Sequence, residues 1–237
     1  MGSATYLIAG KFRSRHFGTK PYLAEALQST GKSKPSVLYV GAPSDDDRTF
    51  GAALCALLKQ QGAHRVHWPK LSRGKDQEQA RSLLREVDLV FVGGGDVEVG
   101  MKVLQEQGLV ADLHDAHARG AVFAAISAGA ILLGERWIRW PEGQEGDDVA
   151  ETFPCLGVVK VSLDTHGESD GWPETQSFVA VRARETGARA RAYAIKSGGA
   201  LVVNGGGVPL ARGLPVGVFA ASPGRKATAL ADVAVQP

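Results

Sequence analysis

The chain has 237 residues, of which 44% are hydrophobic and 22% charged, as is usual for a soluble globular protein. No stretch in the middle has the character of a linker, so we expect residues 1–237 to form a single domain with one substantial core. The net charge of +2 leaves no large basic field, which argues against a nucleic-acid partner.

The sequence also argues against a membrane protein or a secreted one. Its longest apolar stretch, residues 121–134, is broken by Ser127 and falls short of the ~18 residues that a membrane span requires. No secretory signal is visible, and Cys55 and Cys155 are too few for a disulfide framework. We therefore expect a cytoplasmic protein with no membrane partner.

Short apolar runs alternate with helix-like segments from the start of the chain. The segments predicted to be strands are 6–10, 36–41, 64–68, 88–92 and 121–126, and those predicted to be helices are 49–61, 77–86, 98–107 and 109–119. Because the runs are continuously apolar, the strands are expected to be buried by helices on both faces. This pattern predicts an α/β fold with a doubly wound, mostly parallel sheet.

The second half of the chain is less regular. Residues 156–163 are predicted to form a further strand, which ends just before His166. A helix is expected to carry Arg182 and Arg184 on a solvated face. Residues 208–212 and 216–221, separated by glycine and proline, predict a small antiparallel hairpin at one edge of the fold.

The strongest chemical signal is the sequence Ala-Ile-Ser-Ala-Gly-Ala at residues 125–130. An apolar strand ends here at Ser127, small residues flank the serine, and a helix-compatible stretch follows at once. This arrangement is typical of a nucleophile elbow, in which a sharp strand-to-helix turn exposes the serine hydroxyl. The amide of Ala128, at the start of that helix, is then placed to face a developing oxyanion.

A glycine triplet, Gly93 to Gly95, follows the preceding predicted strand and precedes Asp96. Glycines at a strand exit allow the backbone to approach a ligand and expose N–H groups. A donor from this turn would complete an oxyanion hole with the Ala128 amide, while Asp96 is suited to cap the next helix. The turn lacks the G-x-G-x-x-G spacing of a dinucleotide site.

At these residues the chain resembles the dipeptidase E / cyanophycinase family of serine peptidases. The resemblance rests on residues 91–96, on residues 126–130 and on a later Asp164-Thr165-His166. It implies a class I glutamine amidotransferase-like fold, a flavodoxin-like three-layer sandwich. It further implies Ser127 as nucleophile, His166 as general base and Gly94 with Ala128 as oxyanion donors, next to Gly95 and Asp96. Members of the family cleave N-terminal aspartyl dipeptides or aspartate-containing polymers.

Three residues are candidates for the acid that supports His166: Glu168, Glu142 and Asp164. Glu168 has the H-x-E spacing that amidotransferases of this fold use, and it shares a face with His166 and Asp164 if the strand continues past His166. Glu142 lies fifteen residues after Ser127, near where the dipeptidases carry an acid. The glutamate that cyanophycinases use later in the chain has no match in residues 195–200. We favour Glu168, with Glu142 second.

Other polar residues call for structural interpretations. The pairs His64/His67 and His114/His117 are incomplete as zinc sites, so we expect no metal and no organic cofactor. Neither cysteine lies at an elbow. The tryptophans at 137, 140 and 172 are expected in the core or in a lid formed by residues 137–153, and Arg189 and Arg191 on the surface.

The sequence therefore predicts a serine hydrolase that cleaves small, Asp-containing peptides through a Ser-His-acid triad and an acyl-enzyme. Two alternatives stay open: a non-catalytic ligand-binding or regulatory protein of the same fold, and a serine hydrolase of a non-peptide amide or ester. The oligomeric state is open as well, with a homodimer or larger homo-oligomer among the options.

Overall fold

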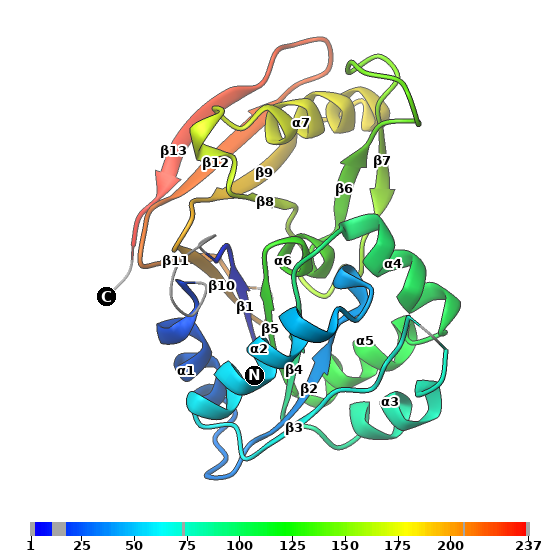
Figure 1. Cartoon of the computed structure of the whole chain (residues 1–237). Helices are drawn as coiled ribbons and strands as arrows, with labels where there is room; N and C mark the ends of the chain where they lie inside the picture. Colours follow the sequence, from blue (N-terminus) through cyan, green and yellow to red (C-terminus); the bar gives the residue numbers. More distant parts are fainter. Residues whose placement is uncertain (1–2, 11–17, 73, 206, 236–237) are drawn as a thin grey trace.

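The structure is a computed structural model, and it describes residues 3–10, 18–72, 74–205 and 207–235 (Figure 1). Its main sheet has seven strands in the order β11-β10-β1-β5-β4-β2-β3. The five strands from β1 to β3 in this order are parallel, and β10 and β11 extend the sheet in antiparallel fashion. The strands are β1 (Ala4–Ile8), β2 (Ser36–Val40), β3 (Arg65–His67), β4 (Leu89–Val92), β5 (Val122–Ile126), β10 (Ala200–Asn204) and β11 (Leu210–Arg212).

Helices cover both faces of this sheet, which confirms the predicted doubly wound α/β fold. Successive residues of each central strand belong to opposite cores. Leu89 and Phe91 of β4 pack in the core under α1 and α2, whereas Val90 and Val92 pack in the core under α3 to α6. The helices are α1 (Lys20–Ser29), α2 (Arg48–Gln60), α3 (Gln77–Leu84), α4 (Val97–Glu106), α5 (Val110–Arg119) and α6 (Ala128–Leu133).

Aspartates begin two of these helices. Asp47 accepts a hydrogen bond from the Phe50 amide at the start of α2, and Asp96 accepts one from the Val99 amide at the start of α4, as predicted for Asp96. A short 3₁₀ helix, η2 (Ala42–Ser44), precedes α2. Within the described residues no helix is both long and apolar enough to cross a bilayer.

A second sheet lies beside the carboxyl edge of the first (Figure 1). Its strand order is β13-β12-β9-β8, and helix α7 packs on it. A two-stranded hairpin, β6 and β7, stands next to α7. The elements are β6 (Arg136–Arg139), β7 (Glu151–Pro154), β8 (Leu163–Thr165), η3 (Gly167–Ser169), α7 (Pro173–Thr186), β9 (Ala190–Ile195), β12 (Val216–Ala221) and β13 (Thr228–Val233).

The prediction of a strand over residues 156–163 is wrong, because β8 covers only Leu163–Thr165. Of the preceding described residues, only Ser162 bonds to a neighbouring strand, through the Tyr193 amide of β9 at 3.0 Å, and the start of the run hydrogen-bonds to the end of α6. The amide of Leu156 donates to the Leu132 carbonyl at 2.9 Å, and that of Val159 donates to Leu133 at 3.2 Å. The apolar run thus satisfies the open carbonyls of a short helix, so its hydrophobicity reflects burial against α6.

The predicted hairpin of residues 208–212 and 216–221 is also wrong. Strand β11 pairs with β10 in the main sheet, whereas β12 pairs with β9 and β13 in the second sheet. The chain changes sheets at Gly213, whose φ of 74° favours glycine and where a Cβ would lie 2.0 Å from the Tyr22 hydroxyl oxygen. The expected antiparallel edge exists, but its strands belong to two sheets. That residues 1–237 form a single domain stays a prediction.

Candidate active site

Ser127 lies between β5 and α6 in a strained backbone conformation, with φ of 54° and ψ of −127°. Its amide donates to the Ile8 carbonyl of β1 at 2.9 Å, and its own carbonyl accepts from the Ala130 amide at 2.8 Å to begin α6. Such a conformation costs on the order of 1–3 kcal/mol in a residue other than glycine, and it persists only where the surroundings impose it. This is the geometry of a nucleophile elbow.

The small residues around Ser127 are required by close backbone packing. A Cβ atom at Gly129 would lie 2.3 Å from the carbonyl oxygen of Gly93 and 2.7 Å from that of Val92. A Cβ atom at Gly94 would lie 3.3 Å from the Cβ of Ser127. The start of α6 therefore rests directly on the exit of β4, which brings the glycine turn next to the serine.

The glycine turn is oriented by the segment after β2. Gly95 has a φ of 142°, and a Cβ there would lie only 2.0 Å from the Pro43 carbonyl oxygen, which accepts the Asp96 amide at 2.7 Å. Among the described residues, nothing accepts a hydrogen bond from the amides of Gly94 or Ala128. Both donors are free to bind an anion at this edge of the sheet.

His166 follows directly after β8, with a left-handed φ of 71°. Its amide donates to the Ile195 carbonyl of β9 at 3.3 Å, which holds the residue to the neighbouring strand. Its Nδ1 lies 3.1 Å from the hydroxyl oxygen of Ser197, in the turn between β9 and β10. Burial lowers the pKa of His166, although the Glu168 charge and the Ala9 carbonyl oppose this shift.

Glu168 does not lie on a strand with His166. The strand ends at Thr165, and Glu168 is within η3, so the expected period-two arrangement is wrong. Its Oε1 instead accepts a hydrogen bond from the Ser197 amide at 3.0 Å. Partial burial opposes ionisation of Glu168, but hydrogen bonds from Ser197 and the nearby imidazole outweigh it, and its pKa lies below the ordinary value.

The other two acid candidates have different surroundings. Asp164 is 6% exposed, and its carboxylate accepts hydrogen bonds from the Thr175 hydroxyl and the Thr165 amide, both at 2.7 Å. Burial raises the pKa of Asp164 to about 6. Glu142 is exposed in the loop between β6 and β7. Of the three candidates, Glu168 is the one that contacts Ser197, which in turn contacts the His166 imidazole.

Ser127 and His166 line one cavity of about 490 Å³ at the junction of the two sheets. Four carboxylates and one guanidinium share this cavity, so it offers sites for both a cation and an anion. Of the predicted site residues Gly95, Asp96 and Ala128 also line it, whereas Glu168 and Gly94 do not. The charged residues are Asp96, Glu98, Asp164 and Glu174, with Arg139 as the guanidinium.

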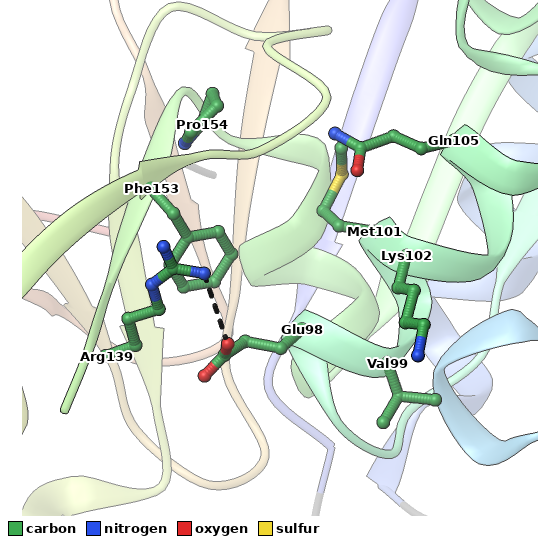
Figure 2. A pocket seen from close by; sticks show the side chains of 8 residues that line it. All are labelled: Glu98, Val99, Met101, Lys102, Gln105, Arg139, Phe153 and Pro154. Atoms are coloured by element: carbon green, nitrogen blue, oxygen red, sulfur yellow. Dashed lines mark ion pairs between the residues drawn. The ribbon is translucent and has the colours of Figure 1, made fainter. Parts of the chain in front are cut away.

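A second cavity of about 420 Å³ adjoins the first between α4 and the β6–β7 hairpin (Figure 2). The two cavities share Glu98, Arg139 and Phe153. Figure 2 shows the Arg139 guanidinium over the Phe153 ring, 5.6 Å from its centroid, with an ion pair of 3.6 Å to Glu98. Arg139 also pairs with Glu151 at 2.6 Å. No pattern in the sequence distinguishes Arg139 from other surface arginines.

Residues 137–153 include a strand at each end and form one wall of the cavity. Trp137 is buried, and its ring stacks on Phe178 of α7 with centroids 5.3 Å apart, which anchors the hairpin to this helix. Trp140, directly after β6, lines the cavity. The tryptophan at 172 is buried as well, over Gly167. The core role expected for Trp137 is confirmed.

The remaining candidates lie outside the cavity. Burial raises the pKa of Cys155 to about 12 and raises that of Cys55 as well, which makes both thiols poor nucleophiles. No group of three histidine, cysteine, aspartate or glutamate side chains with a metal-site arrangement occurs in the described part of the chain. Arg182 pairs with Glu185, and Arg184 donates to carbonyls of the β6–β7 loop.

The protein thus has a three-layer α/β fold, with a strained serine at a strand-to-helix turn beside a cavity. Peptidase family S51 matches residues 7–211, so the chain belongs to this family of serine peptidases. The predicted resemblance to the dipeptidase E family is thereby confirmed. No curated protein matches the chain.

Two solved structures have a similar fold. A peptidase from an acI-B1 Actinobacterium has a TM-score of 0.70 and 15% identity, over 97% of this chain and 98% of that one. A protein from Listeria monocytogenes EGD-e, provisionally described as peptidase E, has a TM-score of 0.65 and 15% identity, over 90% of this chain and 100% of that one. At this level of identity the likeness concerns the fold.

Proposed function

We propose that this protein hydrolyses small peptides, with Ser127 as nucleophile, His166 as general base and Glu168 as the acid that supports His166. The observation that carries the proposal is that the strained Ser127 and the partly buried His166 line the same cavity. Membership of a serine peptidase family supports the reaction class. The lowered pKa of His166 keeps its imidazole neutral at neutral pH, as a general base requires.

In the proposed reaction, the Ser127 hydroxyl oxygen attacks the peptide carbonyl carbon and gives its proton to His166 Nε2. The amides of Gly94 and Ala128 stabilise the resulting oxyanion, with Gly95 and Asp96 holding the turn. The C–N bond then breaks, and the imidazolium protonates the leaving amine. Water, deprotonated by His166, hydrolyses the acyl-enzyme and restores the serine hydroxyl.

The charges in the cavity support a small zwitterionic substrate. A short peptide carries an ammonium and at least one carboxylate, and the cavity presents carboxylates as well as the Arg139 guanidinium. The adjoining cavity gives room for residues beyond the scissile bond. An acidic residue in the substrate, as in the aspartyl dipeptides of the family that the sequence resembles, would use Arg139.

The test combines a fluorophosphonate label with a panel of Asp-X and other dipeptides. Wild type is expected to be labelled and to hydrolyse members of the panel, whereas Ser127→Ala loses both activities. Ser169→Ala is the matched control, because Ser169 is an exposed serine in η3 that does not line the cavity. Labelling that survives in Ser127→Ala would overturn the nucleophile assignment.

The same assay separates the alternatives. Hydrolysis of an activated ester without any peptide turnover would favour a non-peptide substrate. Absence of both labelling and hydrolysis would favour a non-catalytic ligand-binding role, because none of the described carboxylates hydrogen-bonds directly to the His166 ring.

A further inference from the structure

We propose that Ser197 is a positioning residue for catalysis, which links the His166 imidazole to Glu168. This inference rests on the proposed function of Ser127 and His166, and it concerns how the base is held. Ser197 contacts both partners through different atoms. Its hydroxyl oxygen lies 3.1 Å from His166 Nδ1, and its amide donates to Glu168 Oε1 at 3.0 Å.

The backbone around Ser197 is fixed from several sides. In the turn that follows β9, the Gly198 amide donates to the Gly10 carbonyl at 2.5 Å, and the Gly198 carbonyl accepts the Tyr22 hydroxyl at 2.6 Å. The Ala9 amide donates to the Gly199 carbonyl at 3.1 Å. A side chain on so constrained a turn can define the orientation of an imidazole ring.

His166 is tied to the same unit. Its amide donates to Ile195, two residues before Ser197, so the ring and the hydroxyl are carried by directly hydrogen-bonded segments. Strands β8 and β9 are parallel neighbours, with Thr165 opposite Ile195 in their register. The contact between Nδ1 and the hydroxyl is therefore built into the pairing of these strands.

A hydroxyl group is chemically suited to this position because it both accepts and donates. In the proposed arrangement it accepts a hydrogen bond from the His166 Nδ1–H group. It donates its own hydrogen to the Glu168 carboxylate, whose pKa is lowered in part by the Ser197 side chain. With the proton held on Nδ1, Nε2 is left as the acceptor for the Ser127 proton. A carboxylate in direct contact would hold the same tautomer but raise the pKa of the imidazole further.

The competing interpretation is that Ser197 is only a turn residue, since serine and glycine are common in turns. That role would affect stability alone. The two roles are separated by measuring kcat/KM against pH, together with thermal unfolding, for Ser197→Ala, Ser197→Thr and Glu168→Gln. Ser169→Ala again serves as the control.

If Ser197 positions His166, Ser197→Ala lowers kcat by about 10- to 100-fold, less than the full loss of a general base would, and leaves KM nearly unchanged. The acid limb of the pH profile moves to lower pH, because the protonated imidazole loses a hydrogen-bond acceptor and its link to Glu168. Ser197→Thr, which keeps the hydroxyl, restores most of kcat. Glu168→Gln moves the acid limb in the same direction, and the double variant loses less than the product of the two single effects.

Direct NMR titration of the His166 ring makes the test independent of turnover. Ser197→Ala is expected to lower the pKa of this ring and to reduce the preference for the Nδ1-protonated tautomer, whether or not the protein cleaves the chosen peptides. An unchanged titration and pH profile in Ser197→Ala, or in Glu168→Gln should the alanine variant fail to fold, would overturn the proposal. Failure of the fluorophosphonate label on wild type would instead overturn the proposed function.

Discussion

Ser127 and His166 both have positive φ angles, 54° and 71°, and both side chains line the same cavity. Ser127 directly follows a strand of the main sheet, and His166 directly follows a strand of the second sheet. Positive φ is uncommon in residues other than glycine, and strained residues of this kind gather at functional sites. The candidate active site thus lies where strands of the two sheets end beside one cavity.

The strain at Ser127 can be measured with two inactive variants. Ser127→Gly removes the steric conflict of the backbone, whereas Ser127→Ala keeps it, so the glycine variant should be the more stable of the two by about 1 kcal/mol. Urea unfolding of both variants checks this expectation. An alanine variant as stable as the glycine variant would mean that the surroundings do not strain this position.

Packing at the elbow predicts that Gly129→Ala is strongly destabilising. The added methyl group would lie 2.3 Å from the Gly93 carbonyl oxygen, and backbone atoms cannot move aside as a flexible side chain can. We expect a loss of about 1–3 kcal/mol and of most activity. Gly217→Ala on β12 is the control, since a Cβ added there would lie 3.3 Å from its nearest neighbour, the Cβ of Ala194. Equal unfolding midpoints for the two variants would contradict this explanation.

Asp164 predicts a pH dependence of stability between about pH 4 and 6. Burial raises its folded-state pKa to about 6, above the ordinary value of about 3.9, so the folded state binds the proton more tightly. The resulting stabilisation is complete below about pH 4 and is lost as pH rises through 6, with an upper limit on the order of 2–3 kcal/mol.

Asp164→Asn cannot titrate, and its unfolding free energy should be flatter over this pH range than that of wild type. Urea denaturation at pH 4, 5, 6 and 7 measures the difference, and Asp170→Asn provides an exposed control. A wild-type protein that gains stability relative to Asp164→Asn as pH rises from 4 to 6 would have the opposite sign and would contradict the raised pKa.

Arg139 is expected to determine substrate binding, because it lines both cavities and supplies the guanidinium group of the cavity that contains Ser127. Arg139→Gln should raise KM for substrates with an acidic side chain by about 10-fold, the loss of one exposed charge-assisted hydrogen bond, with a smaller effect on neutral peptides. Arg191→Gln is the control, since Arg191 is exposed and lines neither cavity. Equal effects on acidic and neutral peptides would argue for a purely structural role in the Glu98 and Glu151 ion pairs.

Local features of the site could be predicted from the sequence because their causes are neighbours in the chain. The elbow at Ser127 requires small residues on both sides of one serine, and the glycine turn requires free rotation directly after a strand. The position of His166 at a strand exit was also predicted, although the strand is shorter and lies in a separate sheet. A hydrophobic run such as 156–163 does not reveal whether it pairs as a strand or covers a helix end.

The sequence by itself determined the doubly wound layer and the strand–serine–helix turn, because periodicity and residue size act over a few positions. Only the tertiary structure decided what stands behind His166. Ser197 is 31 positions away and reaches the imidazole through the pairing of β8 with β9, while the favoured Glu168 turns to the Ser197 amide when its strand ends. Hydrogen bonds between distant segments depend on which strands pair, and local sequence patterns do not specify that pairing.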